Sequence, residues 1–142
     1  METVYNIDEN TLLHHLTSTK VSDLCGNHID FYEWNNENDE LRAKLKKIGQ
    51  INIQPSDKQW EAPYWGQDTK IQMDCYPNYG CEIFQCKECN TTFFYYLELG
   101  GHGAQKRYRV IRKELIDLET IRPKHQIVID YKDLDYVIYK NP

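Results

Sequence analysis

The sequence lacks any long hydrophobic run: no stretch approaches the roughly 18 apolar residues that a membrane-spanning helix requires. Its start lacks the basic residues and apolar segment of a secretory leader, because Met1–Tyr5 leads directly to the acidic Asp8 and Glu9. Five cysteines, an odd number, do not suit a disulfide framework in such a chain. We therefore expect a cytoplasmic protein that does not associate with membranes and whose cysteines are reduced or bind a metal.

The sequence also lacks the patterns that mark common enzyme sites. Its glycine-rich stretch, Gly100–Gly103, matches neither the GxxxxGK[ST] phosphate-binding loop nor the GxGxxG dinucleotide pattern. A catalytic metal needs three protein ligands, an open position and a nearby base. Glu82 and Glu88, the carboxylates close to the central cysteines, are more simply exposed strand and turn residues. We predict that the protein is not an enzyme.

Aromatic residues are abundant, and acidic residues are concentrated in the first part of the chain. The 142 residues include 11 tyrosines and 3 tryptophans, which suit packed sheets and interfaces. Residues 1–62 contain 11 acids and 6 bases, whereas residues 63–142 contain 11 of each, so the net charge of −5 arises in the first part. The length fits a single domain, 1–142. The acidity favours a basic partner over a nucleic acid.

The central motif is Cys86-Lys87-Glu88-Cys89, which is followed by the apolar Phe93-Phe94. A Cys-x-x-Cys before an aromatic residue is typical of a zinc knuckle, a tight turn in which both thiolates point at one ion. Asn90 stands where glycine is usual, and asparagine is the next best residue at positive φ. The alternative is a metal-free hairpin that two reduced thiols close.

A structural zinc site needs four ligands, so two must come from elsewhere in the chain. Cys25 and His28 have the same spacing as the central pair and would enter from a separate element, as the second pair of a zinc ribbon does. Cys81 lies roughly 16 Å from Cys86 along an extended strand, too far to share an ion. His102 would require the outgoing strand to turn back. We predict a structural zinc site formed by Cys86, Cys89, Cys25 and His28.

Hydrophobic periodicity and turn residues predict an α+β fold. An antiparallel sheet is built around the C-x-x-C hairpin region, about 75–115, with two or three helices mainly in the N-terminal half. Helices are predicted over 11–17, between 36 and 49, and over 113–118. The second helix is predicted because Leu41, Leu45 and Ile48 have helical spacing. Strands are predicted over 51–54, 70–74, 81–84, 92–97, 107–111, 126–130 and 136–139.

Acidic and aromatic residues alternate just before the predicted second helix and at its start. These residues form a predicted partner-binding surface of Asp30, Tyr32, Glu33, Trp34, Glu37 and Asp39. Its acids would steer a cationic partner, and its aromatic rings would supply affinity when buried. Alternatively, the acids are first-turn residues of a solvated helix start.

Three stretches, Cys81–Cys89, Phe93–Gly101 and Arg107–Arg109, resemble small bacterial immunity proteins that are encoded beside polymorphic toxins of the contact-dependent or Rhs type. Those proteins carry a C-x-x-C hairpin followed by an aromatic strand and a Gly-Gly turn. The resemblance covers about residues 75–115. It implies a non-catalytic protein that binds a cognate protein toxin and covers its active site. A basic nuclease would suit the acidic surface, and we expect a monomer or a small homo-oligomer.

The competing expectation is a zinc-ribbon module that binds nucleic acid or acts as a regulator. Its phosphate contacts would come from Lys106, Arg107, Arg109, Arg112 and Lys113. Phe94 and Tyr96 would stack on bases. Charged residues that alternate along a strand and face water explain the same pattern without any nucleic acid.

Overall fold

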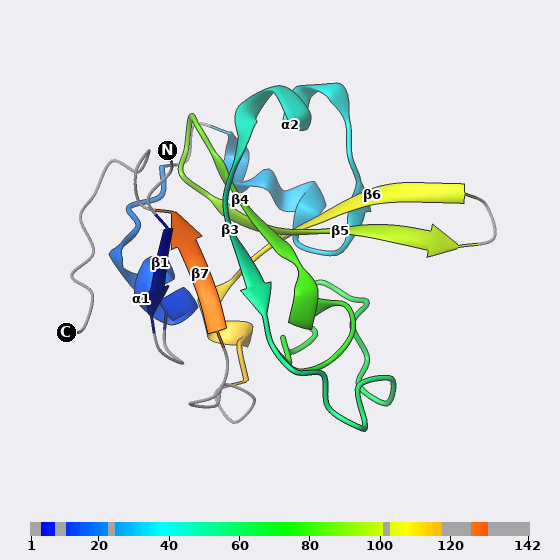
Figure 1. Ribbon diagram of the computed structural model, residues 1–142. Helices are drawn as coiled ribbons and strands as arrows, with labels where there is room; N and C mark the ends of the chain where they lie inside the picture. The colour runs from blue at the N-terminus through cyan, green and yellow to red at the C-terminus, as the bar shows by residue number, and fades with distance from the viewer. Residues whose placement is uncertain (1–3, 8–10, 23–24, 101–102, 118–125, 131–142) are drawn as a thin grey trace.

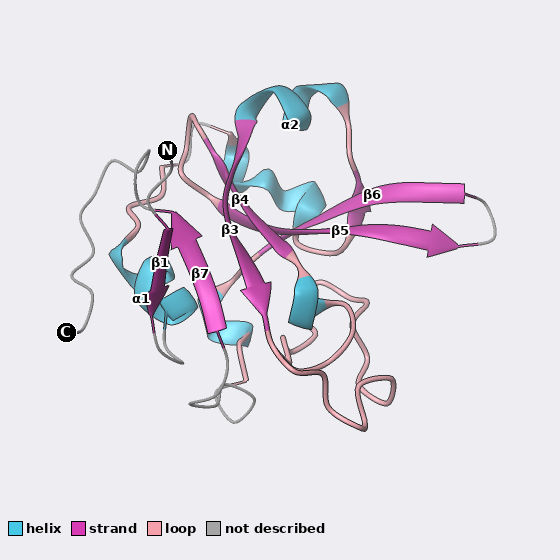
Figure 2. Cartoon of the chain, viewed as in Figure 1, coloured by secondary structure: helices cyan, strands magenta, loops and turns pink. Residues whose placement is uncertain are grey.

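The structure is a computed structural model of the chain and describes residues 4–7, 11–22, 25–100, 103–117 and 126–130. Its main element is a seven-stranded antiparallel sheet with the order β1-β7-β3-β4-β5-β6-β2. The strands are β1 (Val4–Ile7), β2 (Asn35–Asn36), β3 (Leu45–Asn52), β4 (Glu82–Cys86), β5 (Thr92–Gly100), β6 (Gly103–Val110) and β7 (Gln126–Asp130). Figures 1 and 2 show that β5 and β6 project beyond the rest of the sheet as a long hairpin.

The helices of the described chain are short. They are α1 (Thr11–Ser18) and α2 (Asp39–Lys44), with the 3-10 helices η1 (Gly26–Phe31), η2 (Asn78–Gly80) and η3 (Lys113–Leu115). Both α-helices lie in the N-terminal half, so the predicted α+β class is confirmed. None of the helices in the described ranges has the length and apolar character needed to cross a bilayer.

The predicted helix between residues 36 and 49 is wrong beyond Lys44. The α2 helix begins after Asn38, whose side chain accepts a hydrogen bond from the Leu41 backbone amide at 2.7 Å. The chain then enters β3 at Leu45, which packs on one face of the sheet, whereas Ile48 packs on the other. A bulge between Lys47 and Gly49 shifts the register of β3. Leu45 and Ile48 have helical spacing, but a strand places residues three apart on opposite faces.

Other differences concern short or irregular segments. Residues 70–74, predicted as a strand, contribute only an isolated bridge between Ile71 and Ile116. The helix predicted over 113–118 is reduced to η3. The strand predicted over 136–139 lies outside the described residues. The strands β1 and β2 were not predicted; β2 has only two residues, too few to show a periodic pattern.

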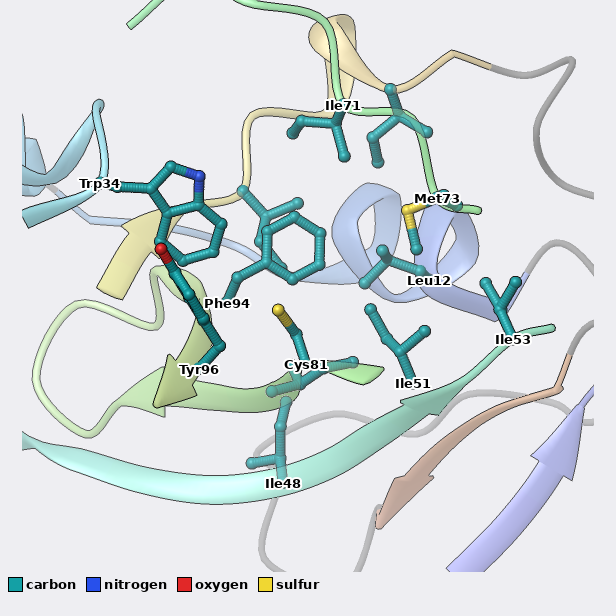
Figure 3. Packing of buried hydrophobic residues seen from close by; sticks show 13 residues of the cluster. Leu12, Trp34, Ile48, Ile51, Ile53, Ile71, Met73, Cys81, Phe94 and Tyr96 are labelled. Atoms are coloured by element: carbon teal, nitrogen blue, oxygen red, sulfur yellow. The ribbon is translucent and has the colours of Figure 1, made fainter. Parts of the chain in front are cut away.

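Alternate residues of the central strands pack on opposite faces of the sheet and form two buried clusters. The first face carries Ile83, Phe94 and Tyr96, which pack with Leu12 from α1 and with Met73 (Figure 3). The second face is covered through η1 and α2, and its buried residues are Phe31, Leu41, Leu45, Cys86, Cys89, Phe93, Tyr108 and Val110. The two central cysteines therefore belong to the cluster beneath η1 and α2.

Candidate metal centre

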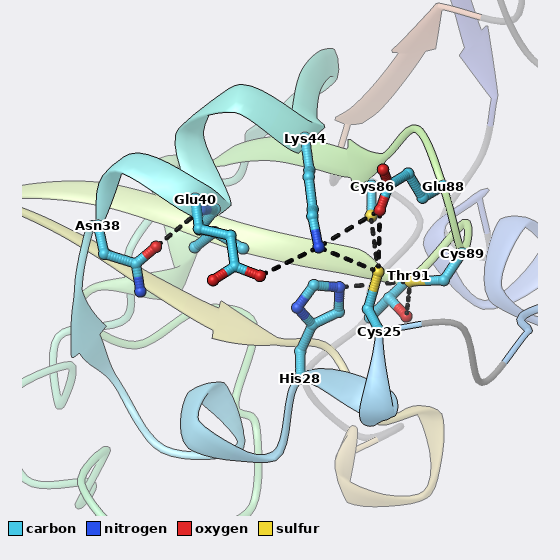
Figure 4. A network of polar contacts seen from close by, with 10 residues as sticks. Cys25, His28, Asn38, Glu40, Lys44, Cys86, Glu88, Cys89 and Thr91 are labelled. Atoms are coloured by element: carbon cyan, nitrogen blue, oxygen red, sulfur yellow. Dashed lines mark hydrogen bonds and ion pairs between the residues drawn. The ribbon is translucent and has the colours of Figure 1, made fainter.

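Four potential metal ligands meet where η1 approaches the turn between β4 and β5. They are Cys25, His28, Cys86 and Cys89, and their donor atoms all lie within 4.8 Å of one another (Figure 4). The Sγ atoms of Cys25 and Cys86 are 3.9 Å apart, and Cys89 Sγ lies 3.3 Å from His28 Nε2. A tetrahedral Zn²⁺ would separate such atoms by about 3.5–3.8 Å, given its usual bond lengths to sulfur and nitrogen. The group could therefore hold a metal ion.

The turn between β4 and β5 positions Cys86 and Cys89. Cys86 ends β4, and its backbone amide donates to Thr91 O while the Asn90 amide donates to Cys86 O, each at 2.9 Å. Asn90 has a φ of 67°, as its place in a knuckle predicted. Its side-chain amide also donates to Lys20 O at 3.3 Å. Both cysteines are fully buried, so the turn directs both thiols inward.

The second pair of potential ligands comes from η1. Cys25 directly precedes this helix and His28 lies within it, so a single tight turn brings both side chains to the same side. His28 has a φ of 53°, a left-handed conformation that residues other than glycine rarely adopt. Its ring packs edge-on against Phe93, with centroids 5.0 Å apart. Unfavourable backbone of this kind occurs where the surrounding structure aims a side chain at a site.

Charged side chains border the group on its exposed side. Lys44 Nζ lies 3.3 Å from the carboxylates of both Glu40 and Glu88, and 3.7 Å from Cys25 Sγ. Hydrogen bonds to Glu40 and Glu88 raise the pKa of Lys44. The Lys44 ammonium therefore remains charged beside the thiols. A dication with three thiolates and a neutral imidazole carries one net negative charge, which this ammonium would offset.

The metal-free thiols differ in how readily they ionise. Burial, reinforced by Cys86 and Cys89, raises the pKa of Cys25 to about 12. Burial also opposes ionisation of Cys89, but hydrogen bonds with Thr91, whose Oγ1 lies 3.1 Å from the sulfur, outweigh it and lower the pKa of Cys89. Burial lowers the pKa of His28 and so keeps its ring neutral, with a lone pair for a metal. Metal binding would therefore release thiol protons.

The remaining cysteines lie elsewhere. Cys81 belongs to the cluster on the first face, and its thiol donates to Pro77 O at 3.0 Å. Burial raises its pKa well above the ordinary value, and burial beside Asp74 raises the pKa of Cys75 to about 11. The structure thus brings together the four ligands that spacing predicted and keeps Cys81 apart. His102 lies outside the described residues.

The bordering residues Lys44, Glu88 and Thr91 were not predicted to take part. Each is an ordinary charged or polar residue with no distinctive spacing, so the sequence carries no signal for its role. Lys44 reaches the site because α2 ends beside it, where the Lys87 backbone amide donates to Lys44 O at 2.7 Å.

The predicted partner-binding residues do not form one surface, and the prediction is wrong for Trp34. Only 3% of Trp34 is exposed. Its ring stacks on Phe94 at 6.2 Å and meets Tyr96 edge-on at 4.7 Å, so it is a core residue. Acidic and aromatic residues alternate before α2 because the aromatic side chains turn toward the interior.

The other members of that set differ in exposure. Tyr32 is half-buried, with the Arg112 guanidinium 4.7 Å above its ring. Glu37 accepts a hydrogen bond from the Tyr108 hydroxyl at 3.0 Å and pairs with Arg42 at 3.4 Å. Its charge is therefore largely compensated by contacts within the molecule. The acidic side chains that remain exposed are Asp30, Glu33 and Asp39.

Three of the seven residues proposed for nucleic-acid binding are buried, whereas Lys106 and Lys113 are exposed. Arg109 is 1% exposed and donates to Tyr32 O at 3.3 Å and Thr69 O at 2.8 Å. Burial lowers its pKa to about 10. Phe94 is fully buried and Tyr96 nearly so. The prediction that these two rings stack on bases is therefore wrong, because neither has a free face.

Comparison of the chain with protein-family models, with curated proteins and with solved structures finds no match. The function must therefore be inferred from the site and the surface. The site offers three sulfur atoms and one nitrogen, all from the protein itself. Four protein ligands complete a tetrahedron and leave no position for a substrate.

Proposed function

We propose that Cys25, His28, Cys86 and Cys89 bind Zn²⁺ in a structural site, and that the protein is a non-enzymatic immunity protein that neutralises a cognate toxin. The observation that carries the metal assignment is the convergence of the four donor atoms, which all lie within 4.8 Å of one another. A set of three sulfur atoms and one imidazole nitrogen in tetrahedral geometry is typical of zinc. A closed set of four protein ligands is typical of structural rather than catalytic zinc.

A zinc ion at this position would connect distant parts of the chain. It would join η1 to the turn between β4 and β5, in addition to the packing of His28 and Phe31 on Phe93. Asp30, which lies in η1, and Asp39, which begins α2 and pairs with Arg42 at 2.7 Å, would then be held in a fixed relation to the sheet. A rigid acidic surface suits the recognition of a cationic protein.

Two observations support a protein partner over a nucleic acid. The chain resembles toxin-associated immunity proteins over about residues 75–115, and its net charge is −5. The rings that would stack on bases are buried, and the guanidinium of Arg109 binds backbone carbonyls. An acidic surface instead imitates the phosphates that a basic nuclease binds.

Metal analysis tests the zinc site directly. Protein purified without a histidine tag should contain about one equivalent of zinc, because the site has one complete ligand set. The Cys25→Ser variant should lose most of this metal. The Cys75→Ser variant is the matched control, since Cys75 lies away from the site, and it should retain zinc. Less than about a tenth of an equivalent in the unaltered protein would refute the assignment.

Co-expression tests the proposed neutralisation. The probe is the toxin domain encoded beside the gene, and the protein should restore growth of cells that produce it. Asp30→Lys with Asp39→Lys should slow association with a cationic toxin by about tenfold at low salt, and less at high salt. Failure to restore growth would refute the immunity function. Retention of RNA or DNA on filters at moderate salt would instead favour the nucleic-acid module.

A further inference from the structure

The strand β5 has an unpaired edge along its outer half. β4 begins at Glu82, which lies opposite Tyr95, so residues beyond Tyr95 have no partner on that side among the described residues. The chain before Glu82 turns away through η2. On its other side β5 stays paired with β6 as far as Gly100. Figure 1 shows this part of the hairpin extending clear of the sheet.

The alternation of hydrogen bonds identifies the backbone groups on that edge. Thr92 O accepts from the Ile111 amide, so Thr92 and every second residue after it bond toward β6. Thr91 O accepts from the Cys86 amide on the other side. The amides and carbonyls of Leu97 and Leu99 therefore point outward from the free edge, and no described residue bonds to them.

The side chains beside this edge are apolar and exposed. Leu97 is 44% exposed and Leu99 is 78% exposed, on the same face of the strand. A hollow of about 360 Å³ borders the edge where β4 would continue, and its walls include Tyr76, Tyr79 and Tyr95. Unpaired edges with apolar side chains are sites where a further strand can add.

Glu98, between the two leucines, determines which strand fits. Its carboxylate accepts a hydrogen bond from the Tyr76 hydroxyl at 2.8 Å and has no ion-pair partner within the described ranges. A second copy paired symmetrically about Glu98 would place Glu98 opposite Glu98, which destabilises such a pair. Each copy also carries a net charge of −5. The charge thus disfavours a homodimer and favours a basic residue at this position.

We infer that the outer edge of β5 is the docking site for an extended segment of a protein partner, which adds as an antiparallel strand with lysine or arginine opposite Glu98 and apolar residues opposite Leu97 and Leu99. The edge geometry is independent of the toxin assignment. Only the identity of the protein that donates the strand rests on the proposed function.

A synthetic peptide tests the edge without any toxin. The probe is a short peptide in which valines flank a central lysine, and its matched control carries glutamate in place of the lysine. The lysine peptide should bind at least about threefold more tightly, because opposite charges face each other across the strands. In amide NMR spectra it should shift and protect Leu97 and Leu99. Methylating the amides of the two valines should abolish binding, whereas methylating the lysine amide, which faces away, should not.

Two variants at one position separate backbone from side chain. Leu99→Pro and Leu99→Ala both remove the leucine side chain, but only proline removes the outward amide. The proline variant should bind the lysine peptide at least about fivefold more weakly than the alanine variant. Equal zinc content and thermal stability of the two variants would show that both remain folded. Glu98→Lys should reverse the preference so that the glutamate peptide binds better.

Several results would overturn the inference. These are no binding of either peptide, equal binding of both, shifts confined to other residues, or self-association of the protein through β5. Restoration of growth by the Leu99→Pro variant in toxin-producing cells would refute the toxin as the donor of the strand while leaving the proposed neutralisation intact. Failure of the unaltered protein to restore growth would refute the toxin assignment. Peptide binding would still test whether the outer edge of β5 is a docking site.

Discussion

Removing zinc from the site should lower the free energy of unfolding by about 4 kcal/mol. Cys25 and Cys86 are 61 positions apart in the sequence. An unfolded chain can hold an ion at one Cys-x-x-Cys pair, but to add the second pair it must close this loop at a cost of about 4 kcal/mol. Zinc therefore binds the folded state roughly a thousandfold more tightly, and this difference is the most that saturating zinc adds to stability.

Thermal unfolding with and without a chelator measures this contribution. For a chain of about this length, 4 kcal/mol corresponds to a fall in Tm of about 10 °C. Returning zinc should restore the Tm. The Cys25→Ser variant should be insensitive to the chelator, whereas Cys75→Ser should respond as the unaltered protein does. A fall in Tm below about 2 °C in protein shown to contain zinc would refute the reasoning, because the folded state would then gain little from the cross-link.

Three further predictions concern single residues. As pH rises from 9 toward 12, the metal-free protein should lose more stability than its Cys25→Ser variant, because the pKa of Cys25 rises from 9.0 to about 12 on folding and the Cys25 thiol then ionises in that range only when unfolded; urea unfolding of both proteins across pH measures this. Asn90→Ala should cost about 1 kcal/mol in urea unfolding, whereas Asn90→Gly should cost little, because φ is 67°. Arg109→Met should cost about 2 kcal/mol by the same measurement, because Tyr32 O and Thr69 O lose buried donors.

Each of these predictions has a contradicting result. Metal-free stability that rises between pH 9 and 12 relative to that of the Cys25→Ser variant would mean that the folded state stabilises the Cys25 thiolate. Equal stability of the alanine and glycine variants of Asn90 would mean that the turn changes conformation. A more stable Arg109→Met variant would mean that desolvating the guanidinium costs more than its hydrogen bonds return.

The four potential metal ligands could be predicted because their signal is local. A Cys-x-x-Cys turn is defined by a few adjacent residues, and Asn90 adopts the positive φ that its place in such a turn requires. The matching spacing of Cys25 and His28 indicated the second pair. Only the fold could show that η1 lies over the turn, because that contact joins residues about 60 positions apart.

The helix predicted beyond Lys44 and the surface role of Trp34 failed for a common reason. Both predictions rest on a pattern of residue types. That pattern does not show which side of an element faces the interior. In β3, Leu45 and Ile48 have helical spacing but face opposite sides of the sheet. Before α2, the aromatic ring of Trp34 turns into the core against Phe94. Neither orientation can be recognised without the neighbouring strands.

The sequence by itself determined the fold class, the likeness of Cys86–Cys89 to a zinc knuckle, and the four potential ligands, because periodicity and turn chemistry act over short distances. The tertiary structure alone decided which acids remain exposed, that Arg109 binds carbonyls in the interior, and that the outer edge of β5 is unpaired among the described residues. These properties depend on contacts between distant segments. Burial and pairing are established only when the strands assemble into one sheet.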